Sequence, residues 1–363
     1  MRIEKISLEN LRNYKTFEFK FPEDKNIVLF IGKNGKGKTN FLEAIYTLSL
    51  GRSFRSQQYE DLIFWDEEFA RIKAHIKNEE DGIDLESFFS KFPRKMKVFK
   101  KNDVRIKHQD FLGNLATVLF HPEDLNMLYL SPSLRRKYMD ITLSQTDKEY
   151  LVNFGNYRKV LKQRNSLLSQ IRERKFKSEN VNNLFVNLEV LNLQIIEYGK
   201  RVIEKRVILI DYLNKNIEKN YREISGGNEK IKVEYLTKLD LKNIEESYYK
   251  KLEDRRDLEI LKGKTLYGPH LDDLKFFIDD HEISKSASRG EFRTLLLTIK
   301  LAEISFIKER IGEYPVLLLD DVFSELDIGR QKHFLKSIEG CQTIITATEN
   351  FLDIKDDLEV IKI

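Results

Sequence analysis

The first forty residues show the hydrophobic pattern of β-strands. Phe17, Phe19 and Phe21 alternate with polar neighbours at a period of two, which is typical of a strand with one buried face. Residues 26–31 then form a nearly continuous apolar run, as expected of a strand buried on both faces. A glycine-rich turn follows, and residues 40–46 have helical spacing. The pattern therefore predicts a strand, a turn and a helix in that order.

Strand patterns return near the carboxyl end. Residues 315–319 form an apolar run that ends in two aspartates, and residues 342–346 form another. Earlier in the chain, residues 91–109 contain two alternating runs around Asn102 and Asp103, which indicates a hairpin. These patterns predict α/β segments at both ends of the chain.

The middle of the chain is different. From about residue 146 to about residue 254, glycine and proline almost vanish and apolar residues recur at helical spacing. The seam is too short for a long rod and favours a short antiparallel helical arm packed on itself. We therefore expect an α/β fold built from 1–145 and 255–363, with 146–254 inserted as a helical arm domain. The seam residues, separated by alternating steps of four and three, are Leu184, Leu188, Leu191, Ile195, Tyr198 and Val202.

Composition excludes several classes of protein. Hydrophobic residues make up 41% and charged residues 34% of the 363 residues, which is enough apolar material for a large core and argues against intrinsic disorder. The single cysteine, Cys341, allows no intramolecular disulfide and fits a reducing compartment. No apolar run approaches the ~20 residues that span a bilayer, and the first residues lack a signal-peptide pattern. We therefore expect a cytoplasmic protein without membrane segments.

One glycine-rich segment matches the phosphate-binding P-loop pattern G-x-x-x-x-G-K-[ST] without a mismatch. It lies between the predicted strand 26–31 and the predicted helix 40–46, the context that this motif requires. Its glycines allow backbone amides to curl around phosphate oxygens, and the helix N-terminus adds partial positive charge. Lys38 is expected to bridge the β- and γ-phosphates of ATP, and the Thr39 hydroxyl to ligate Mg²⁺. The segment consists of Gly32, Lys33, Asn34, Gly35, Lys36, Gly37, Lys38 and Thr39.

The strand that ends in Asp320 and Asp321 fits the second element of such ATPases. An apolar strand there delivers a carboxylate to the metal, so Asp320 is expected to hold Mg²⁺ through water. Asp321 is expected to orient or deprotonate the attacking water. Further upstream, Ser288 and Gly290 open a strongly helical stretch in which Ser288 would cap the helix. As a cap alone, Ser288 needs no further function.

The order of these segments decides their interpretation. A P-loop, a serine–glycine signature, an apolar strand with two aspartates and a Ser-x-Leu-Asp segment ending at Asp327 follow one another as in ABC-type ATPase heads. In that class two heads face each other, and the signature of one touches the γ-phosphate held by the other. The resemblance thus makes Ser288, Gly290 and Asp327 candidate nucleotide contacts. The long separation of P-loop and signature resembles the chromosome-maintenance branch.

Within that branch, the chain resembles the RecF family of bacterial DNA replication and repair proteins over nearly its whole length. The most particular matches are residues 157–165 and the tripeptide Gly268-Pro269-His270. Further matching segments are 11–14, 32–49, 51–55, 120–125, 135–136 with 139–140, the signature, and 317–327.

The family resemblance implies a function. RecF-like proteins bind ATP with Mg²⁺, form an ATP-dependent homodimer and bind duplex DNA. They act with the partners RecR and RecO at single-strand gaps in DNA, where they help replace single-strand-binding protein with the recombinase, and their slow hydrolysis acts as a switch. In related heads the stretch between the first two strands reaches the nucleotide. Arg12 and Asn13 are therefore secondary site candidates, although a surface turn accounts for them equally well.

Two positions depart from the family pattern. Leu271 stands where the family commonly has arginine after Gly-Pro-His, and Glu291 stands where the signature commonly ends in glutamine. A carboxylate beside a triphosphate is unfavourable unless it points away. We therefore expect no direct phosphate contact from Glu291.

Two basic clusters support DNA binding independently of the resemblance. Segment 91–109 holds eight Lys and Arg residues against Asp103 alone, and segment 158–177 holds eight against Glu173. Such clusters can neutralise phosphates, so binding should fall steeply with salt. The alternative is two solvated faces without a ligand. The candidate DNA-binding residues are Arg94, Lys95, Lys97, Lys100, Lys101, Arg105, Lys107, Arg158, Lys162 and Arg164.

Two alternative interpretations use the same ATPase head. A transporter-type ABC ATPase subunit would couple the insert to membrane proteins, but the chain lacks the short spacing and the apolar coupling patch of that class. An SMC-like structural tether would need a long coiled coil and a Cys-x-x-Cys hook, whereas the seam is short and the chain has one cysteine. The sequence favours an ATP-dependent DNA-binding protein of recombinational repair with weak ATPase activity.

Overall fold

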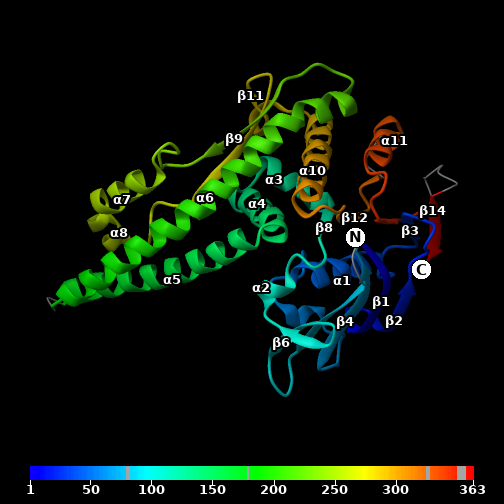
Figure 1. Ribbon diagram of the computed structural model, residues 1–363, viewed down its shortest axis with the longest axis horizontal. Coiled ribbons are helices and arrows are strands. Elements are labelled where there is room, and N and C mark those ends of the chain that lie inside the picture. The colour runs from blue at the N-terminus through cyan, green and yellow to red at the C-terminus, as the bar shows by residue number, and fades with distance from the viewer. Residues whose placement is uncertain (79–81, 178–179, 324–327, 350–356) are drawn as a thin grey trace. The chain divides into compact units, whose positions relative to one another are not determined.

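The chain forms two compact units, which are coloured along the sequence in Figure 1. The computed structural model describes residues 1–78, 82–177, 180–323, 328–349 and 357–363. The first unit, here called the head, consists of Met1–Leu125, Lys219–Asn228 and Ser288–Ile363. The second unit, the arm, consists of Asn126–Glu218 and Glu229–Ala287.

The predicted insert, 146–254, forms a part of the arm rather than the whole of it. Helix α4 (Pro132–Thr146) and strand β10 (Asp273–Ile278), both expected in the head, belong to the arm. The reason is long-range pairing: β10 is antiparallel to β9 (Ile231–Leu236) inside the insert, and Arg135 of α4 lies 2.6 Å from the Asp273 carboxylate. Conversely, residues 219–228 of the predicted insert cluster with the head.

A five-stranded parallel sheet forms the core of the head. The strand β12 (Val316–Asp320) is buried along its whole length, as expected of a strand covered on both faces. Its Leu317 packs in one hydrophobic cluster with Leu297 of helix α10 (Arg289–Ile311) and Phe334 of helix α11 (Ile328–Ser337). The strand order is β14 (Leu358–Lys362), β3 (Ile27–Ile31), β13 (Thr343–Ala347), β12 (Val316–Asp320) and β8 (Thr117–Phe120).

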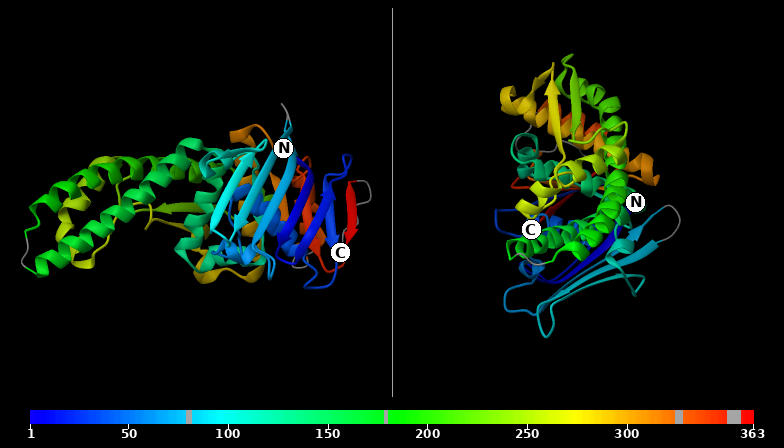
Figure 2. Two further views of the ribbon diagram at one scale, coloured as in Figure 1. Left: turned by 90° about the horizontal axis from the view of Figure 1, so that it is seen from below. Right: turned by 90° about the vertical axis from the view of Figure 1, so that its left-hand side faces the viewer.

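A separate six-stranded antiparallel sheet completes the head, and its strands lie side by side in the left view of Figure 2. The predicted α/β fold of the head is confirmed, with one parallel and one antiparallel sheet. The hairpin predicted at Asn102 and Asp103 is confirmed, since both residues have positive φ between β6 and β7. The order is β2 (Tyr14–Lys20), β1 (Arg2–Leu11), β4 (Phe69–Lys77), β5 (Gly82–Ser90), β6 (Met96–Lys101) and β7 (Val104–Ile106).

Helix α1 (Lys38–Leu50) contacts both sheets, with β12 and β13 on one and β4 and β5 on the other. Because its neighbours surround it, most of its side chains are buried, and these include the carboxylate of Glu43. Cys341 is buried elsewhere in the head, in the cluster of Leu297 and Phe334, and this burial raises the pKa of its thiol to about 12. The helix that follows the P-loop is therefore held rigidly by the whole head.

Two long helices dominate the arm, α5 (Lys148–Phe176) and α6 (Asn182–Ser225), and they run side by side in Figure 1. The predicted heptad seam is buried at every seventh residue, Leu188, Ile195 and Val202. The remaining arm elements are α3 (Asn126–Tyr129), α7 (Ile244–Asp254), α8 (Arg256–Lys262), α9 (Ile283–Ser286) and β11 (His281–Glu282). The short head elements are η1 (Tyr59–Leu62), α2 (His108–Phe111) and η2 (Pro122–Leu125).

Candidate functional site

The P-loop connects β3 directly to α1. Gly35 and Gly37 have backbone φ values of 82° and 107°, which residues other than glycine rarely adopt. A Cβ on Gly37 would also lie 2.6 Å from the Asn13 amide. Gly37 caps α1 without any side-chain hydrogen bond, so the first amides of the helix face the loop without a capping group. Lys38 Nζ lies within this loop and donates to the carbonyls of Gly32 at 2.6 Å and Lys33 at 3.2 Å.

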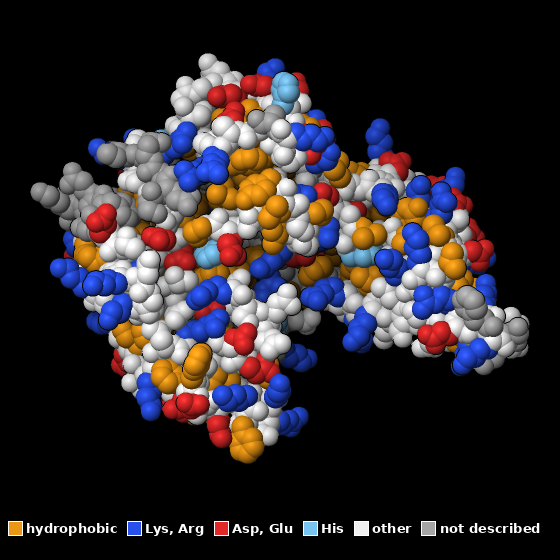
Figure 3. Space-filling model, turned by 180° about the vertical axis from the view of Figure 1, so that it is seen from behind, with side chains coloured by type: hydrophobic (Ala, Val, Ile, Leu, Met, Phe, Trp, Pro, Cys, Tyr) orange, Lys and Arg blue, Asp and Glu red, His pale blue; other side chains and the backbone are white. Residues whose placement is uncertain are grey.

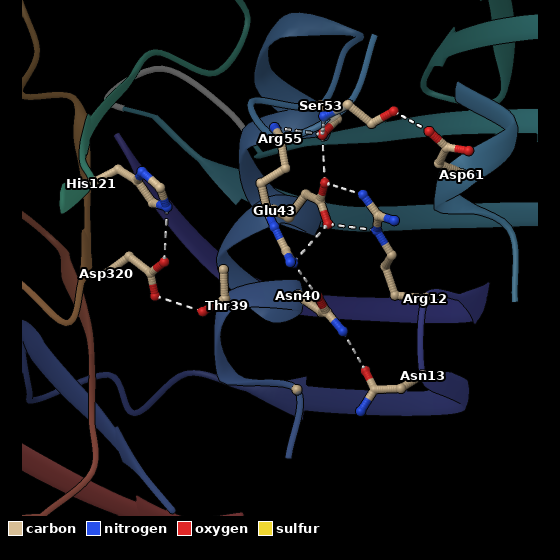
Figure 4. Close-up of polar contacts among 12 residues, drawn as sticks. Arg12, Asn13, Thr39, Asn40, Glu43, Ser53, Arg55, Asp61, His121 and Asp320 are labelled. Carbon is tan, nitrogen blue, oxygen red and sulfur yellow. Dashed lines mark hydrogen bonds and ion pairs between the residues drawn. The ribbon is translucent and has the colours of Figure 1, made fainter. Parts of the chain in front are cut away.

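The two predicted metal ligands meet at the start of α1 and the end of β12. Thr39 Oγ1 donates to Asp320 Oδ1 at 2.9 Å, as Figure 4 shows. Thr346 Oγ1 of the neighbouring strand β13 donates to the same oxygen at 2.7 Å, which fixes the carboxylate. Asp320 is buried, so its negative charge is concentrated where the P-loop helix begins. A hydroxyl and a carboxylate are the hard oxygen ligands that Mg²⁺ prefers.

His121 is a member of this site that sequence reasoning missed. Its Nε2 lies 3.6 Å from Asp320 Oδ2 (Figure 4). The contact arises because His121 directly follows β8, the strand beside β12. A lone histidine without metal-ligand spacing is most simply structural. Its place at the end of an apolar strand, in a segment that carries the family resemblance, was the signal that could have found it.

Asp321 has a left-handed backbone, with φ 55°, directly after β12. Its amide donates to the carbonyl and to the hydroxyl of Thr346, both at 3.2 Å. These bonds hold the residue beside Asp320 despite the strained conformation. Its predicted role toward water stays a prediction, and Asp327 lies outside the described residues.

Arg12 and Asn13 have different surroundings although they are neighbours in sequence. The Arg12 guanidinium binds the buried Glu43 carboxylate with two hydrogen bonds of 2.8 and 2.7 Å (Figure 4). Asn13 instead donates to the Lys36 carbonyl at 3.2 Å and accepts from Asn40 of α1 at 2.8 Å. Asn13 therefore contacts the P-loop, whereas Arg12 braces the helix that follows it.

Glu43 gathers further polar groups around α1. Ser53 donates a short hydrogen bond to Glu43, and Arg55 lies 3.9 Å from it while donating to Asn40 at 2.8 Å. The network links the turn between β1 and β2, helix α1 and the segment after it (Figure 4). Sequence reasoning singled out Arg12 but not Glu43, because a glutamate inside a helix carries no motif.

The signature begins α10 as a complete capping box. Ser288 Oγ accepts from the Glu291 amide at 3.3 Å, and the Glu291 carboxylate accepts from the Ser288 amide at 2.6 Å. These hydrogen bonds lower the pKa of Glu291. The carboxylate is thus turned onto its own helix start, which explains how this departure from the family pattern is accommodated. A Cβ on Gly290 would have only Ser288 Oγ nearby, at 3.9 Å.

The first basic cluster contains two kinds of cation. Lys95 lies 2.7 Å and Lys100 3.2 Å from glutamates, and Lys101 donates to Asn114 at 2.8 Å. Lys97 Nζ lies 4.7 Å from the centre of the Tyr59 ring. By contrast, the candidates Arg94, Arg105 and Lys107 are exposed and have neither an ion pair nor a ring contact within the described part of the chain. On the face drawn in Figure 3, Lys and Arg are interspersed with Asp and Glu rather than gathered in one stripe.

The second basic cluster requires a correction. Arg164 is fully buried and binds Glu259 at 2.6 Å, with hydrogen bonds to Asn192 and Thr265 at 2.8 Å each. It is a structural residue of the arm and has no surface for a DNA phosphate. Arg158 and Lys162 are exposed on α5 and stay predicted DNA contacts.

No helix among the described residues is long and apolar enough to cross a membrane.

Comparisons with known proteins agree on one family. The model of the RecF/RecN/SMC N terminal domain matches residues 2–358. The DNA replication and repair protein RecF of Bacillus cereus strain G9842 is 39% identical over 355 residues, which cover 96% of this chain and 92% of that protein. RecF of Bacillus thuringiensis strain Al Hakam is 38% identical over the same coverage.

Solved structures give the same result. The recombination mediator protein RecF-ATP of the RecFOR pathway has a TM-score of 0.90 and 35% identity, covering 99% of this chain and 95% of its own. The RecF-ATPrS structure has a TM-score of 0.88 and 34% identity, covering 100% and 96%. The Smc head domain of Pyrococcus furiosus is similar in fold alone, with a TM-score of 0.51 and 17% identity over 96% of this chain and 89% of its own.

Proposed function

Since this chain belongs to the RecF family of DNA replication and repair proteins, we propose that it is an ATP-dependent DNA-binding mediator of recombinational repair. The supporting observation is the Thr39–Asp320 contact at the open start of α1, inside a P-loop with the required backbone. Its relatives named RecF-ATP and RecF-ATPrS match this chain in fold over 95% and 96% of their own length.

The residues present fit ATP and Mg²⁺. The uncapped amides of α1 and the Lys38 ammonium would hold the phosphates, and Asn13 would border them through its contact with Lys36. Thr39 and Asp320 would hold the metal, which neutralises charge on the phosphates when bound. Asp321 orients or deprotonates the attacking water. Arg12 acts through Glu43 as a positioning residue rather than a nucleotide contact.

The proposed ATPase activity is weak and serves as a switch. Ser288 and Gly290 present the start of a 23-residue helix, α10, with a hydroxyl and the positive end of its dipole. We assign this helix end to the γ-phosphate held by a second copy of the chain. ATP would thereby hold an intracellular homodimer together, and hydrolysis would release it.

The dimer is the form proposed to bind duplex DNA at single-strand gaps, with RecR and RecO as partners in loading the recombinase. Arg94, Arg105 and Lys107 on the head, and Arg158 and Lys162 on α5, supply exposed cations for backbone phosphates. A transporter subunit and a structural tether have no observation in their favour.

The proposal is tested by measuring the mass of the chain in solution with ATP and Mg²⁺, together with gel shifts on duplex and gapped DNA. A dimer and a DNA complex that both require ATP are expected. Lys38→Met should abolish tight ATP binding and both of these properties, because the charge on the β- and γ-phosphates is lost. DNA binding that ignores ATP, or nucleotide affinity of Lys38→Met within a few-fold of the parent, would contradict the proposal.

A further inference from the structure

The only tryptophan of the chain, Trp65, is 86% exposed. It stands in a tight turn in which the Glu67 amide donates to the Phe64 carbonyl at 3.1 Å. The Phe64 amide is held in turn by the Asn10 carbonyl of β1 at 2.8 Å, and Asp66 adopts a positive φ of 66°. An indole on a well-anchored turn with almost no burial is an unusual use of a large apolar side chain.

A second exposed aromatic residue lies at the same end of the strands of the antiparallel sheet. Phe92 is 61% exposed in the turn between β5 and β6. The two turns are adjacent because Phe69 of β4 pairs with Ser90 of β5, and the Lys91 amide donates to the Glu68 carbonyl at 2.9 Å. Among the described residues of the head, Val104 is the one other large hydrophobic side chain that is exposed. Val104 lies at the opposite end of β6, beyond the 102–103 turn.

The charge around these rings is asymmetric. Lys91 and Arg94 are exposed on the Phe92 turn, and Lys95 and Lys97 follow them on the same segment. Of the acids at this edge, Glu60 is paired with Lys95, and Glu67 is paired with Lys15 at 3.6 Å. Asp66 directly follows Trp65 and Glu68 lies three residues beyond it, and both are exposed, so the positive charge lies on the Phe92 side. We call Trp65, Phe92, Lys91, Arg94, Lys95 and Lys97 the aromatic edge.

We propose that the aromatic edge binds unpaired bases of single-stranded DNA. The indole and phenyl rings serve as stacking platforms, and the cations of the Phe92 turn hold the adjoining phosphates, the combination used by proteins that bind single strands without sequence preference. A protein partner fits the edge less well, because the centres of protein interfaces are depleted in Lys, Asp and Glu. The inference rests on the proposed DNA-binding function and adds to it a site in this chain for the unpaired strand of a gap.

The single tryptophan makes the test direct, because all indole fluorescence of the full chain comes from Trp65. With ATP and Mg²⁺ present, single-stranded oligothymidylate should quench this fluorescence, and a blunt duplex of equal length should leave it nearly unchanged. Quenching caused by ATP alone, with no further change on adding the oligonucleotide, would show a contact between two chains and overturn the inference.

Variants separate the stacking contact from the rest of the DNA surface. Trp65→Ala should weaken binding of oligothymidylate, measured by anisotropy of a labelled strand, by about tenfold, as the loss of one stacked base predicts. Trp65→Phe should retain most of the affinity. Val104→Ala, which trims a 65% exposed residue at the other end of β6, is the matched control and should bind as the parent does.

The failure of this inference is distinguishable from failure of the proposed function. Parental oligothymidylate affinity in Trp65→Ala, with ATP-dependent duplex binding intact, overturns the stacking site alone. A chain that binds neither duplex nor single strand overturns both.

Discussion

At the scale of single residues, Arg164 and Lys162 show opposite uses of the same charge two positions apart. Replacing Arg164 with Met should leave the Glu259 carboxylate buried without its partner and lower the free energy of unfolding by about 3–5 kcal/mol. Lys162→Met, on the exposed face of α5, is the matched control and should change it by less than about 0.5 kcal/mol. Denaturant unfolding of both variants measures the difference, and equal effects would contradict the assignment of Arg164 to the arm interior.

A sequence motif predicts the position of a single residue better than a count of charged residues in a segment does. The P-loop pattern predicted a strand, a turn and a helix around Lys38 and Thr39, and α1 begins two residues before the predicted helix. Thr39 and Asp320, both predicted as metal ligands, are in contact. Counting charges could not place Arg164, because a cluster in sequence spreads around a helix. Periodicity could have done so, since Arg164 shares the buried face of Val160 and Leu168.

At the scale of elements, the segment between α8 and β10 is held by buried polar groups of the arm. Gly268 has a φ of 120°, and a Cβ there would collide with the Tyr248 hydroxyl. The next residues are tied by Arg206, which donates to the Pro269 carbonyl at 2.7 Å, and by His270, which meets Tyr157 at 2.5 Å and the Thr265 carbonyl at 3.2 Å. The family-specific tripeptide thus has a structural role within the arm.

This segment predicts a pH dependence of stability. Burial, with nearby arginines, lowers the pKa of His270 to about 4. In the unfolded chain this imidazole is protonated near its usual pKa of about 6.5, so the neutral His270 makes its full contribution to the free energy of unfolding above that pH. As the pH falls toward about 4, the free energy of unfolding should decrease by about 3 kcal/mol in total. Unfolding of the parent and of His270→Gln between pH 7.5 and 4.5 measures this, and parallel pH profiles would contradict it.

Arg105 of the edge strand β7 and Lys107, directly after that strand, are two cations suited to test duplex binding. Arg105→Glu with Lys107→Glu should weaken ATP-dependent duplex binding and reduce its salt slope by about one for each phosphate that the chain no longer neutralises. ATP binding should stay intact. Lys15→Glu with Lys20→Glu makes the same charge change on β2, the opposite edge strand of the sheet, and serves as the control. An effect of equal size in the control would indicate net charge rather than a contact surface.

At the scale of the whole molecule, the proposed active site is completed by a second copy of the chain. Ser288→Arg should remove ATP-driven dimerisation and hydrolysis together while ATP binding by the monomer stays nearly normal. Removing the helix cap should cost the chain only about 1 kcal/mol of stability. Sedimentation with and without ATP and Mg²⁺ gives the readout, and unchanged ATP-driven dimerisation would exclude the shared site.

Mixing this variant with Lys38→Met sharpens the experiment. A heterodimer places both lesions in one site and leaves the other site intact, so part of the ATPase activity should return if one site can act alone. Ser288→Ala, which removes the hydroxyl without adding bulk, separates steric blocking from loss of the hydrogen-bonding group.

The sequence predicted that the chain has a head and an arm, but it did not predict the boundaries between them. Motif order predicted an ATPase head, and helical periodicity predicted an arm. The boundaries depended on the pairing of β9 with β10, two strands far apart in the chain. Neither composition nor periodicity shows which distant strands pair. Domain boundaries drawn from these two properties alone therefore assign β10 to the head instead of the arm.

The deep burial of Cys341 has a practical consequence for labelling chemistry. The thiolate is the reactive form of cysteine, and a pKa of about 12 in the head core leaves almost none of it at neutral pH. The natural chain is therefore a background in which maleimide dyes or spin labels should react only with a cysteine introduced at an exposed position. Distances between labelled sites can then be followed through the nucleotide cycle without first removing a native cysteine.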